Sequence, residues 1–268
     1  MDATAPPRLL SIAGSDSGGG AGIQADLKAF ARCGAHGMTA ITAITAQNTV
    51  GVTAVHPLPP EAVIDQVRAV AEDIGVDAVK IGMLGDVATI EAVREALGLL
   101  RGVPVVVDPV MVSESGSVLL RDDARTALRE QILPLATVVT PNLPEARVLA
   151  ERPDEDDARE LACRIRSFGP AAVVVTGGHR REGSDLYYDG QDFREIEGER
   201  HPDGAAHGSG CTHSSALAAF LAHGHSPLEA AQRARVVAGE AVRDGLRSIG
   251  RGVGPVDALG IASRGPDA

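Results

Sequence analysis

The stretch Val103-Pro104-Val105-Val106-Val107-Asp108-Pro109 decides the fold class of this 268-residue chain. Three consecutive valines leave no polar side chain for a solvent-facing side, which is typical of a parallel strand covered by helices on both faces. A carboxylate directly after such a strand is unfavourable unless it meets a metal ion or a hydrogen-bond donor. The stretch therefore predicts a buried parallel sheet and a ligand site at Asp108.

Short aliphatic segments alternate with longer amphipathic ones along the rest of the chain. We expect strands at 9–13, 39–45, 52–56, 78–81, 103–107, 137–140 and 171–175, and a hairpin of 184–188 with 193–197. We expect helices at 23–32, 60–74, 87–100, 122–133, 144–150, 156–168, 212–222 and 227–245. This order predicts an α/β fold with a mostly parallel, doubly wound central sheet and helices on both faces. Without a linker or repeat, residues 1–268 form one domain, with frayed ends at 1–7 and 260–268.

The composition excludes several classes of protein. The chain is 44% hydrophobic but only 2% aromatic, so its core must be aliphatic. A net charge of -11 argues against nucleic acid or an anionic membrane as partner. Cys33, Cys163 and Cys211 are odd in number and lack C-x-x-C spacing, so neither a disulfide framework nor a zinc site follows. Residues 1–7 resemble no secretory signal, and we expect a cytoplasmic protein.

The segment His207-Gly208-Ser209-Gly210-Cys211-Thr212 precedes an apolar helical stretch. Glycines at a helix start leave backbone N–H groups unblocked, and the helix dipole adds partial positive charge there. Such a start can bind an anion, most readily a phosphate. A cysteine in the first turn is expected to have a lowered pKa. The alternative is a glycine-capped turn before an ordinary helix.

Ligands of open α/β sheets bind outside the carboxyl ends of the strands, and several predicted strands end in polar or glycine residues. Gly14 opens a glycine-rich segment that lets backbone approach a ligand closely. Gln47 offers an amide that can pair with a heterocycle, or else caps a turn. Lys80 either points to a phosphate or extends along the protein surface to reach solvent. Further strand ends carry Met83, Thr140 and Thr176.

Asn142 and Glu145 lie three residues apart at a predicted helix start. At this spacing both oxygens can face one magnesium ion or its waters. The alternative for Glu145 is a carboxylate that interacts favourably with the positive end of its own helix dipole. With Asp108 and the anion-binding helix start, these residues favour phosphoryl transfer. The absence of G-K-[ST] excludes a P-loop enzyme, and the lack of an acidic residue in 39–48 argues against a nicotinamide dehydrogenase.

Seven segments in order carry a family resemblance: 11–26 (SIAGSDSGGGAGIQAD), 42–49 (TAITAQNT), 80–84 (KIGML), 108–112 (DPVMV), 140–146 (TPNLPEA), 177–179 (GGH) and 207–212 (HGSGCT). The chain resembles the hydroxymethylpyrimidine and phosphomethylpyrimidine kinases of thiamine biosynthesis, a branch of the ribokinase-like fold. The resemblance implies that ATP and Mg²⁺ serve to phosphorylate 4-amino-5-hydroxymethyl-2-methylpyrimidine and then its monophosphate. It also implies a homodimer.

The resemblance also assigns roles to individual residues. Gly14, Asp26, Gln47, Met83 and Val110 would line the pyrimidine pocket, and Asp108, Asn142 and Glu145 would serve magnesium and phosphate. Gly208, Gly210 and Cys211 would form the anion hole and, with Asp108, would be the catalytic residues. Thr176, Gly178, His179, Gly208 and Ser209 would bind the nucleotide.

Three positions depart from related patterns. Cys211 stands where ribokinase-like sugar kinases carry a catalytic Asp. Glu114 is acidic where many relatives have Lys or a small residue, so its loop either faces away from the phosphates or acts as a lid. Thr176 stands where relatives often carry Lys, a loss for which Arg180 or Arg181 would compensate. Two alternative functions stay open: a pyridoxal-type kinase, distinguished at Gln47 and Met83, and a non-catalytic pyrimidine-binding protein.

Overall fold

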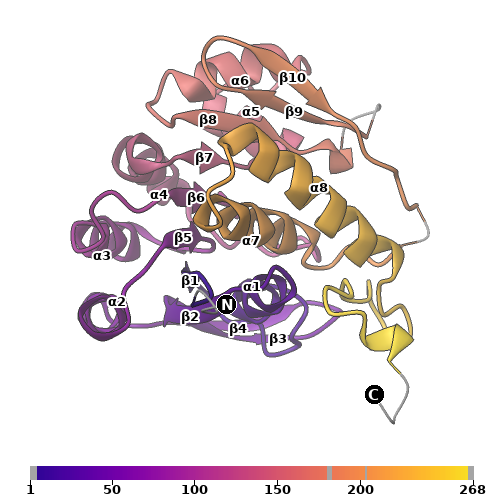
Figure 1. The fold of residues 1–268 in the computed structure, drawn as a ribbon, viewed down its shortest axis with the longest axis horizontal. Helices are drawn as coiled ribbons and strands as arrows, with labels where there is room; N and C mark the ends of the chain where they lie inside the picture. Colours follow the sequence, from indigo (N-terminus) through magenta and orange to yellow (C-terminus); the bar gives the residue numbers. More distant parts are fainter. Residues whose placement is uncertain (1–4, 180–182, 203, 265–268) are drawn as a thin grey trace.

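A central sheet of eight strands organises the computed structural model, which describes residues 5–179, 183–202 and 204–264 (Figure 1). The strand order is β10-β9-β8-β7-β6-β5-β1-β2. The strands are β1 (Arg8–Ala13), β2 (His36–Ile41), β5 (Ala78–Ile81), β6 (Val105–Val107), β7 (Val138–Val139), β8 (Ala172–Val175), β9 (Asp185–Tyr188) and β10 (Phe193–Ile196). In this sheet order, all neighbouring strands between β8 and β2 pair in parallel, and β9 and β10 add an antiparallel hairpin next to β8. The predicted mostly parallel sheet is confirmed.

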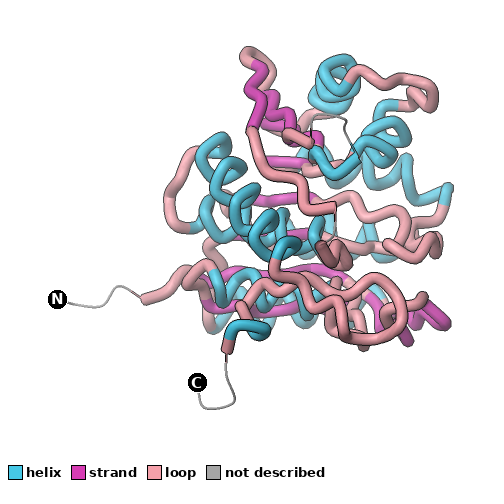
Figure 2. The backbone as a smooth tube through the Cα atoms, turned by 90° about the vertical axis from the view of Figure 1, so that its right-hand side faces the viewer, coloured by secondary structure: helices cyan, strands magenta, loops and turns pink. Residues whose placement is uncertain are grey.

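Helices cover both faces of this sheet (Figures 1 and 2). One face carries α2 (Pro60–Asp73), α3 (Val87–Leu97), α4 (Asp122–Ala127), α5 (Leu143–Ala150) and α6 (Ala158–Arg166). The other carries α1 (Gly22–Arg32), α7 (Ser209–Ala222) and α8 (Pro227–Arg243). Successive strand residues divide between the two layers, so Val105 and Val107 pack on the first and Val106 on the second. All three valines are buried, as their unbroken run predicted.

The strand expected at 39–45 is wrong, because the chain leaves the central sheet after Ile41. Thr42 separates two strands, and its hydroxyl donates a hydrogen bond to the Met83 carbonyl at 2.8 Å. The next strand, β3 (Ala43–Gln47), pairs antiparallel with β4 (Val52–Pro57) in a separate two-stranded sheet. Gln47 therefore ends a strand outside the central sheet.

The helix expected at 122–133 is interrupted. α4 stops at Ala127, and residues 128–132 form a π-helical turn followed by a 3₁₀ turn at Leu133–Leu135. Pro134 explains why the helix does not continue beyond Leu133, since proline has no N–H to donate to an α-helix. Near the C-terminus, part of the end expected to fray forms a 3₁₀ turn at Ile261–Ser263, where the Asp257 carboxylate accepts from two backbone N–H groups. Residues 1–4 and 265–268 lie outside the described residues.

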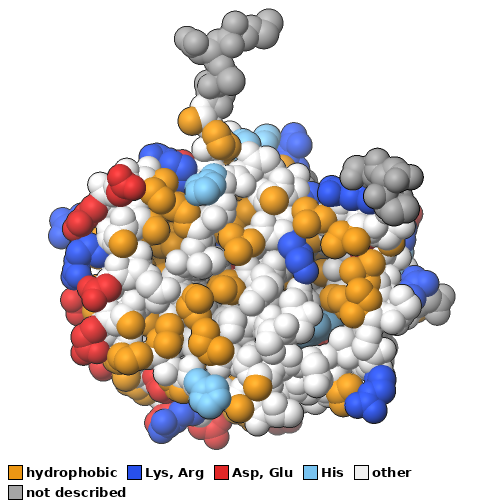
Figure 3. Space-filling view, turned by 90° about the horizontal axis from the view of Figure 1, so that it is seen from below, with side chains coloured by type: hydrophobic (Ala, Val, Ile, Leu, Met, Phe, Trp, Pro, Cys, Tyr) orange, Lys and Arg blue, Asp and Glu red, His pale blue; other side chains and the backbone are white. Residues whose placement is uncertain are grey.

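The two-stranded sheet lies on the underside of the molecule in Figure 1. Ile44, Val50 and Val55 are 42%, 56% and 40% exposed there. Figure 3 shows apolar side chains spread over this face with few charges near its centre. The expected homodimer stays a prediction. In the part of the chain that is described, no helix has the length and apolar character needed to cross a membrane.

Candidate active site

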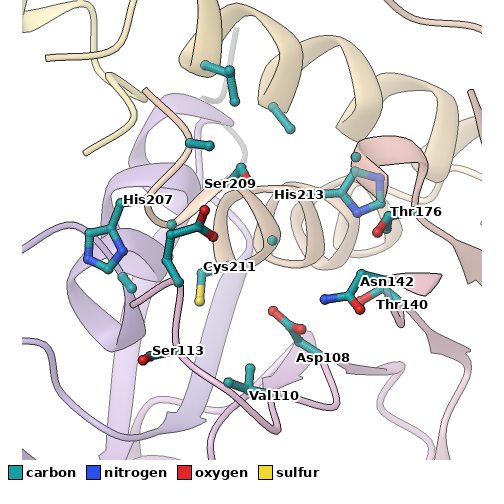
Figure 4. A pocket seen from close by; sticks show the side chains of 18 of the residues that line it. Asp108, Val110, Ser113, Thr140, Asn142, Thr176, His207, Ser209, Cys211 and His213 are labelled. Carbon is teal, nitrogen blue, oxygen red and sulfur yellow. The ribbon is translucent and has the colours of Figure 1, made fainter. Parts of the chain in front are cut away.

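A cavity of about 350 Å³ opens at the carboxyl ends of the parallel strands, against the start of α7 (Figure 4). Strands β1, β5, β6, β7 and β8 each deliver a residue to it because parallel strands end at the same edge of the sheet. The cavity is lined by these predicted site residues: Gly14, Gln47, Met83, Asp108, Val110, Asn142, Glu145, Thr176, Gly178, Gly208, Ser209, Gly210 and Cys211.

Asp26 is not among the residues that line the cavity, although we expected it there. Its carboxylate is fully buried under α7 and accepts hydrogen bonds from Lys80 Nζ at 2.8 Å, Ser11 Oγ at 2.6 Å and Ser215 Oγ at 2.8 Å. The geometry gives Asp26 the place of a buried counter-ion. Of the other predicted residues, His179 closes a short 3₁₀ turn, but its side chain lies outside the described part, as do Arg180 and Arg181.

Lys80 forms a cation in the floor of the cavity. Its side chain is fully buried, so it does not extend to bulk solvent. Besides the contact with Asp26, Nζ lies 3.9 Å from Asp108 Oδ2. Burial lowers the pKa of Lys80, but the charges of Asp26 and Asp108 and the hydrogen bond to Asp26 outweigh this effect, and the net pKa is raised. Lys80 therefore stays charged and faces carboxylates.

The start of α7 has the geometry of an anion site. Gly208 adopts φ 87°, and a Cβ there would lie 1.8 Å from the Gly20 carbonyl oxygen, so only glycine fits. Ser209 N–H donates to the Ala206 carbonyl at 2.9 Å. Among the residues described, no acceptor bonds the N–H of Gly210 or Cys211. The first turn thus offers unused backbone donors next to the cavity.

The expectation of a lowered pKa for Cys211 is wrong. Burial raises the pKa of its thiol to about 12, and the charge of Lys80 opposes this only in part. The nearby carboxylates Asp26 and Asp108 raise it further. Desolvation and these negative charges exceed the effect of the helix terminus, so the thiol is neutral at pH 7.

Asn142 and Glu145 form a capping box at the start of α5. Asn142 Oδ1 accepts from Glu145 N–H at 2.9 Å, and Glu145 Oε2 accepts from Asn142 N–H at 3.0 Å. The interpretation of Glu145 as a helix N-terminal carboxylate is therefore confirmed. A magnesium role for both residues stays a prediction.

Glu145 and Asp108 place two carboxylates at one wall of the cavity. Burial raises the pKa of Glu145 to about 8, and the charge of Asp108 contributes. A cation between such carboxylates would relieve their repulsion. The described residues contain no group of three or more His, Cys, Asp or Glu side chains able to hold a metal. Because Mg²⁺ is commonly held by one or two carboxylates together with substrate phosphates, the pair fits an ion that arrives with a nucleotide.

Asp16 organises the glycine-rich segment after β1, a role that our sequence analysis missed. Its carboxylate accepts from the N–H groups of Gly18, Gly20 and Ala21 at 2.8, 3.1 and 2.8 Å. His207 Nε2 lies 2.9 Å from the same carboxylate. The segment after β1 is thereby tied to the residue before the anion site. An Asp followed closely by glycines is a recognisable signal for this kind of loop.

Gly14, Met83 and Gln47 also line the cavity. Met83 is 7% exposed, and a Cβ on Gly14 would lie 2.4 Å from Met83 Cε, so Gly14 leaves space for the methionine. Gln47 Oε1 accepts from Thr45 Oγ1 at 3.3 Å. Glu114 lines the cavity as well, so a loop facing away from the site is wrong and the lid interpretation stays a prediction.

Comparisons with known proteins find one matching family model and several kinases. A family model described as phosphomethylpyrimidine kinase matches residues 16–257. A hydroxymethylpyrimidine/phosphomethylpyrimidine kinase of Rhizobium meliloti is 49% identical over 253 residues, covering 92% of this chain and 95% of that protein. The pyridoxal kinase from Staphylococcus aureus in complex with AMP-PCP and pyridoxal is 36% identical with a TM-score of 0.87, covering 97% and 96%. The phosphomethylpyrimidine kinase from Clostridium difficile 630 is 41% identical with a TM-score of 0.78, covering 88% and 99%.

Proposed function

This chain belongs to the phosphomethylpyrimidine kinase family, and from that premise we propose that it uses ATP and Mg²⁺ to phosphorylate 4-amino-5-hydroxymethyl-2-methylpyrimidine and then its monophosphate. The products would be the monophosphate and the pyrophosphate, with one ADP released in each step. Family membership makes the chain a kinase, and the two substrates and the nucleotide are the content of the proposal. A non-catalytic pyrimidine-binding protein is not supported, since the relatives are named as kinases.

The start of α7 is the observation on which the proposal rests. Its unused N–H groups at Gly210 and Cys211 face the same cavity as Asp108 and Glu145. A phosphoryl group between these walls would meet donors on one side and the carboxylate pair on the other. Mg²⁺ held by Asp108 and Glu145 would neutralise phosphate charge. Catalysis then rests on positioning and charge stabilisation.

The aminopyrimidine ring is assigned to the end of the cavity lined by Gly14, Gln47, Met83 and Val110. An aminopyrimidine presents a ring acceptor beside an amino donor, and the Gln47 amide can pair with both. Met83 offers a flexible apolar surface against the ring. In this pose the hydroxymethyl group of the substrate points toward the anion site.

The neutral thiol of Cys211 suits both substrates. The monophosphate has a second pKa of about 6 and is already an anion at neutral pH, so the second transfer needs no base. An Asp at position 211 would repel this incoming phosphate. A thiol with a pKa of about 12 brings no charge to the site. For the same reason Cys211 does not deprotonate the alcohol in the first transfer.

A pyridoxal-type kinase is the second candidate function, favoured by one observation. The pyridoxal kinase from Staphylococcus aureus in complex with pyridoxal has a TM-score of 0.87 to this chain. The two functions would share the anion site and the carboxylate pair. They differ in the ring that Gln47 and Met83 contact.

A coupled assay of ADP release with Mg²⁺ tests the proposal. The hydroxymethylpyrimidine, its monophosphate and pyridoxal are compared under the same conditions, and reactions without the acceptor control for hydrolysis of ATP. Turnover of both pyrimidines supports the proposal. Turnover of pyridoxal alone overturns the roles given to Gln47 and Met83, and turnover of only one pyrimidine overturns the two-step reaction.

A further inference from the structure

Three polar side chains line the cavity beyond the anion site, two of them buried and the third largely buried, and the proposed phosphoryl transfer uses none of them. They are Asp185 at the start of β9, His213 in α7 and Arg235 in α8. His213 follows Cys211 by two residues and lies beside the anion site. In Figure 4 its ring points toward Thr176, at the end of β8.

Hydrogen bonding in this group is incomplete. The His213 side chain is 5% exposed, and neither of its ring nitrogens has a partner among the described residues. Within the same part of the chain, Asp185 Oδ2 and Arg235 Nε also lack hydrogen-bond partners. Buried polar atoms are nearly always satisfied, so several orphans in one cavity wall indicate that a polar ligand completes them.

Asp185 holds the other two side chains near the cavity. Its Oδ2 lies 3.3 Å from His213 Nε2, and its Oδ1 lies 3.8 Å from Arg235 Nε. Oδ1 also accepts from Gly177 N–H at 2.6 Å, and Arg235 Nη2 donates to the Gly183 carbonyl at 2.6 Å. Burial raises the pKa of Asp185, but the nearby His213 ring, the charge of Arg235 and the hydrogen bond from Gly177 N–H outweigh it, and the net pKa is lowered.

Arg235 is the cation best fixed for a ligand at this end. Lys80 is engaged by Asp26 and Asp108, and Thr176 carries no charge. Arg200 also lines the cavity but is exposed, whereas the Arg235 side chain is only 15% exposed. A guanidinium has five N–H donors, and the Gly183 carbonyl uses one of them. The remaining donors match phosphate oxygens better than a sugar or a base.

We propose that His213 and Arg235 bind the phosphate groups that stay with the leaving nucleotide, and that Asp185 positions both side chains. This inference rests on the proposed use of ATP. It assigns the charge absent at Thr176 to Arg235 in α8, with His213 in α7 as a neighbouring hydrogen-bonding group. The transferred phosphate lies at the start of α7, and the retained ones extend from there toward His213.

Equilibrium binding of ADP, AMP and adenosine to the intact protein separates phosphate contacts from base and ribose contacts. We expect Arg235→Gln to weaken ADP binding about tenfold or more, as for loss of one charge-assisted hydrogen bond, with a smaller loss for AMP and none for adenosine. Arg235→Lys keeps the charge and most of the affinity. His213→Gln replaces the ring by an amide with a different geometry and weakens ADP about threefold, as for one lost neutral hydrogen bond. Arg233→Gln, exposed on the same helix, is the matched control and leaves all three affinities unchanged.

Equal losses for adenosine and ADP would overturn the phosphate assignment, because the cluster would then contact base or ribose. Unchanged ADP binding in both Arg235→Gln and His213→Gln would also overturn it and leave the cluster with a structural role. If circular dichroism shows that Arg235→Gln is unfolded, the ADP affinities of His213→Gln and Arg235→Lys test the proposal instead. Failure of the unmodified protein to bind ADP contradicts the proposed function itself, which distinguishes the two failures.

Discussion

Replacement of Glu145 by Gln is expected to stabilise the ligand-free protein at alkaline pH while removing a carboxylate that the proposed reaction needs. Burial, with the charge of Asp108, raises the pKa of Glu145 from 4.5 to about 8. Between these values the folded protein binds a proton that the unfolded chain releases, so stability falls as pH rises through this window. The loss of folding stability caused by Glu145 is complete above pH 8 and absent below pH 4.5.

The magnitude follows from the same two values. At about 1.4 kcal/mol per pKa unit, the difference corresponds to an upper bound of about 5 kcal/mol. Glu145 keeps some exposed surface, so solvent screening reduces the effect, and we expect a gain of about 3 kcal/mol at pH 8.5. At pH 5 folded Glu145 is neutral like Gln, and the gain falls below about 1 kcal/mol. Gln preserves the capping box with Asn142, so the substitution changes charge with little change in shape.

Urea unfolding followed by far-ultraviolet circular dichroism at pH 5 and pH 8.5 measures this difference without tryptophan, which the chain lacks. Glu229→Gln is the matched control, since Glu229 occupies the same capping position of α8. Hydrogen bonds from Ser226 lower the pKa of Glu229, and the Glu229→Gln substitution therefore brings no gain in stability at alkaline pH. An equal stability change in Glu145→Gln at both pH values, or a loss at pH 8.5, would refute the reasoning.

The remaining predictions concern the start of α7. In urea unfolding, Gly208→Ala is expected to destabilise the protein by about 2 kcal/mol more than Gly224→Ala. Both glycines have φ 87°, but only at Gly208 would a Cβ clash with backbone, namely the Gly20 carbonyl. Equal losses of stability in the two variants would contradict the clash. Iodoacetamide at pH 8 should modify exposed Cys163 long before Cys211, whose thiol pKa is about 12, as followed by peptide mass spectrometry. Rapid labelling of Cys211 would show that its thiol is not held neutral. Cys211→Asp should lower kcat/KM for the monophosphate more than for the alcohol, since the new charge repels a phosphate; matching losses would exclude that explanation.

Much of the fold was predictable because its causes are local. An unbroken valine run such as Val105–Val107 suits a strand buried on both faces, and helix starts such as Asn142 with Glu145 carry their own capping chemistry. The position of strand ends at one sheet edge then predicts which residues meet in the cavity. The break at Thr42 was not predictable, because the Met83 carbonyl that it contacts is far away in the sequence.

The site, like the fold, has a part that local sequence predicts and a part that depends on tertiary contacts. Local sequence predicted a glycine-flanked anion site at Gly208–Cys211 and the strand-end residues around it, because helix ends and strand ends have backbone geometry that neighbouring residues set. Only the tertiary structure decided that Asp26 pairs with Lys80, that Cys211 is a neutral thiol, and that Asp185 stands behind His213 and Arg235. Burial and charge at a side chain depend on segments brought together from distant parts of the chain, and no local pattern encodes that desolvation.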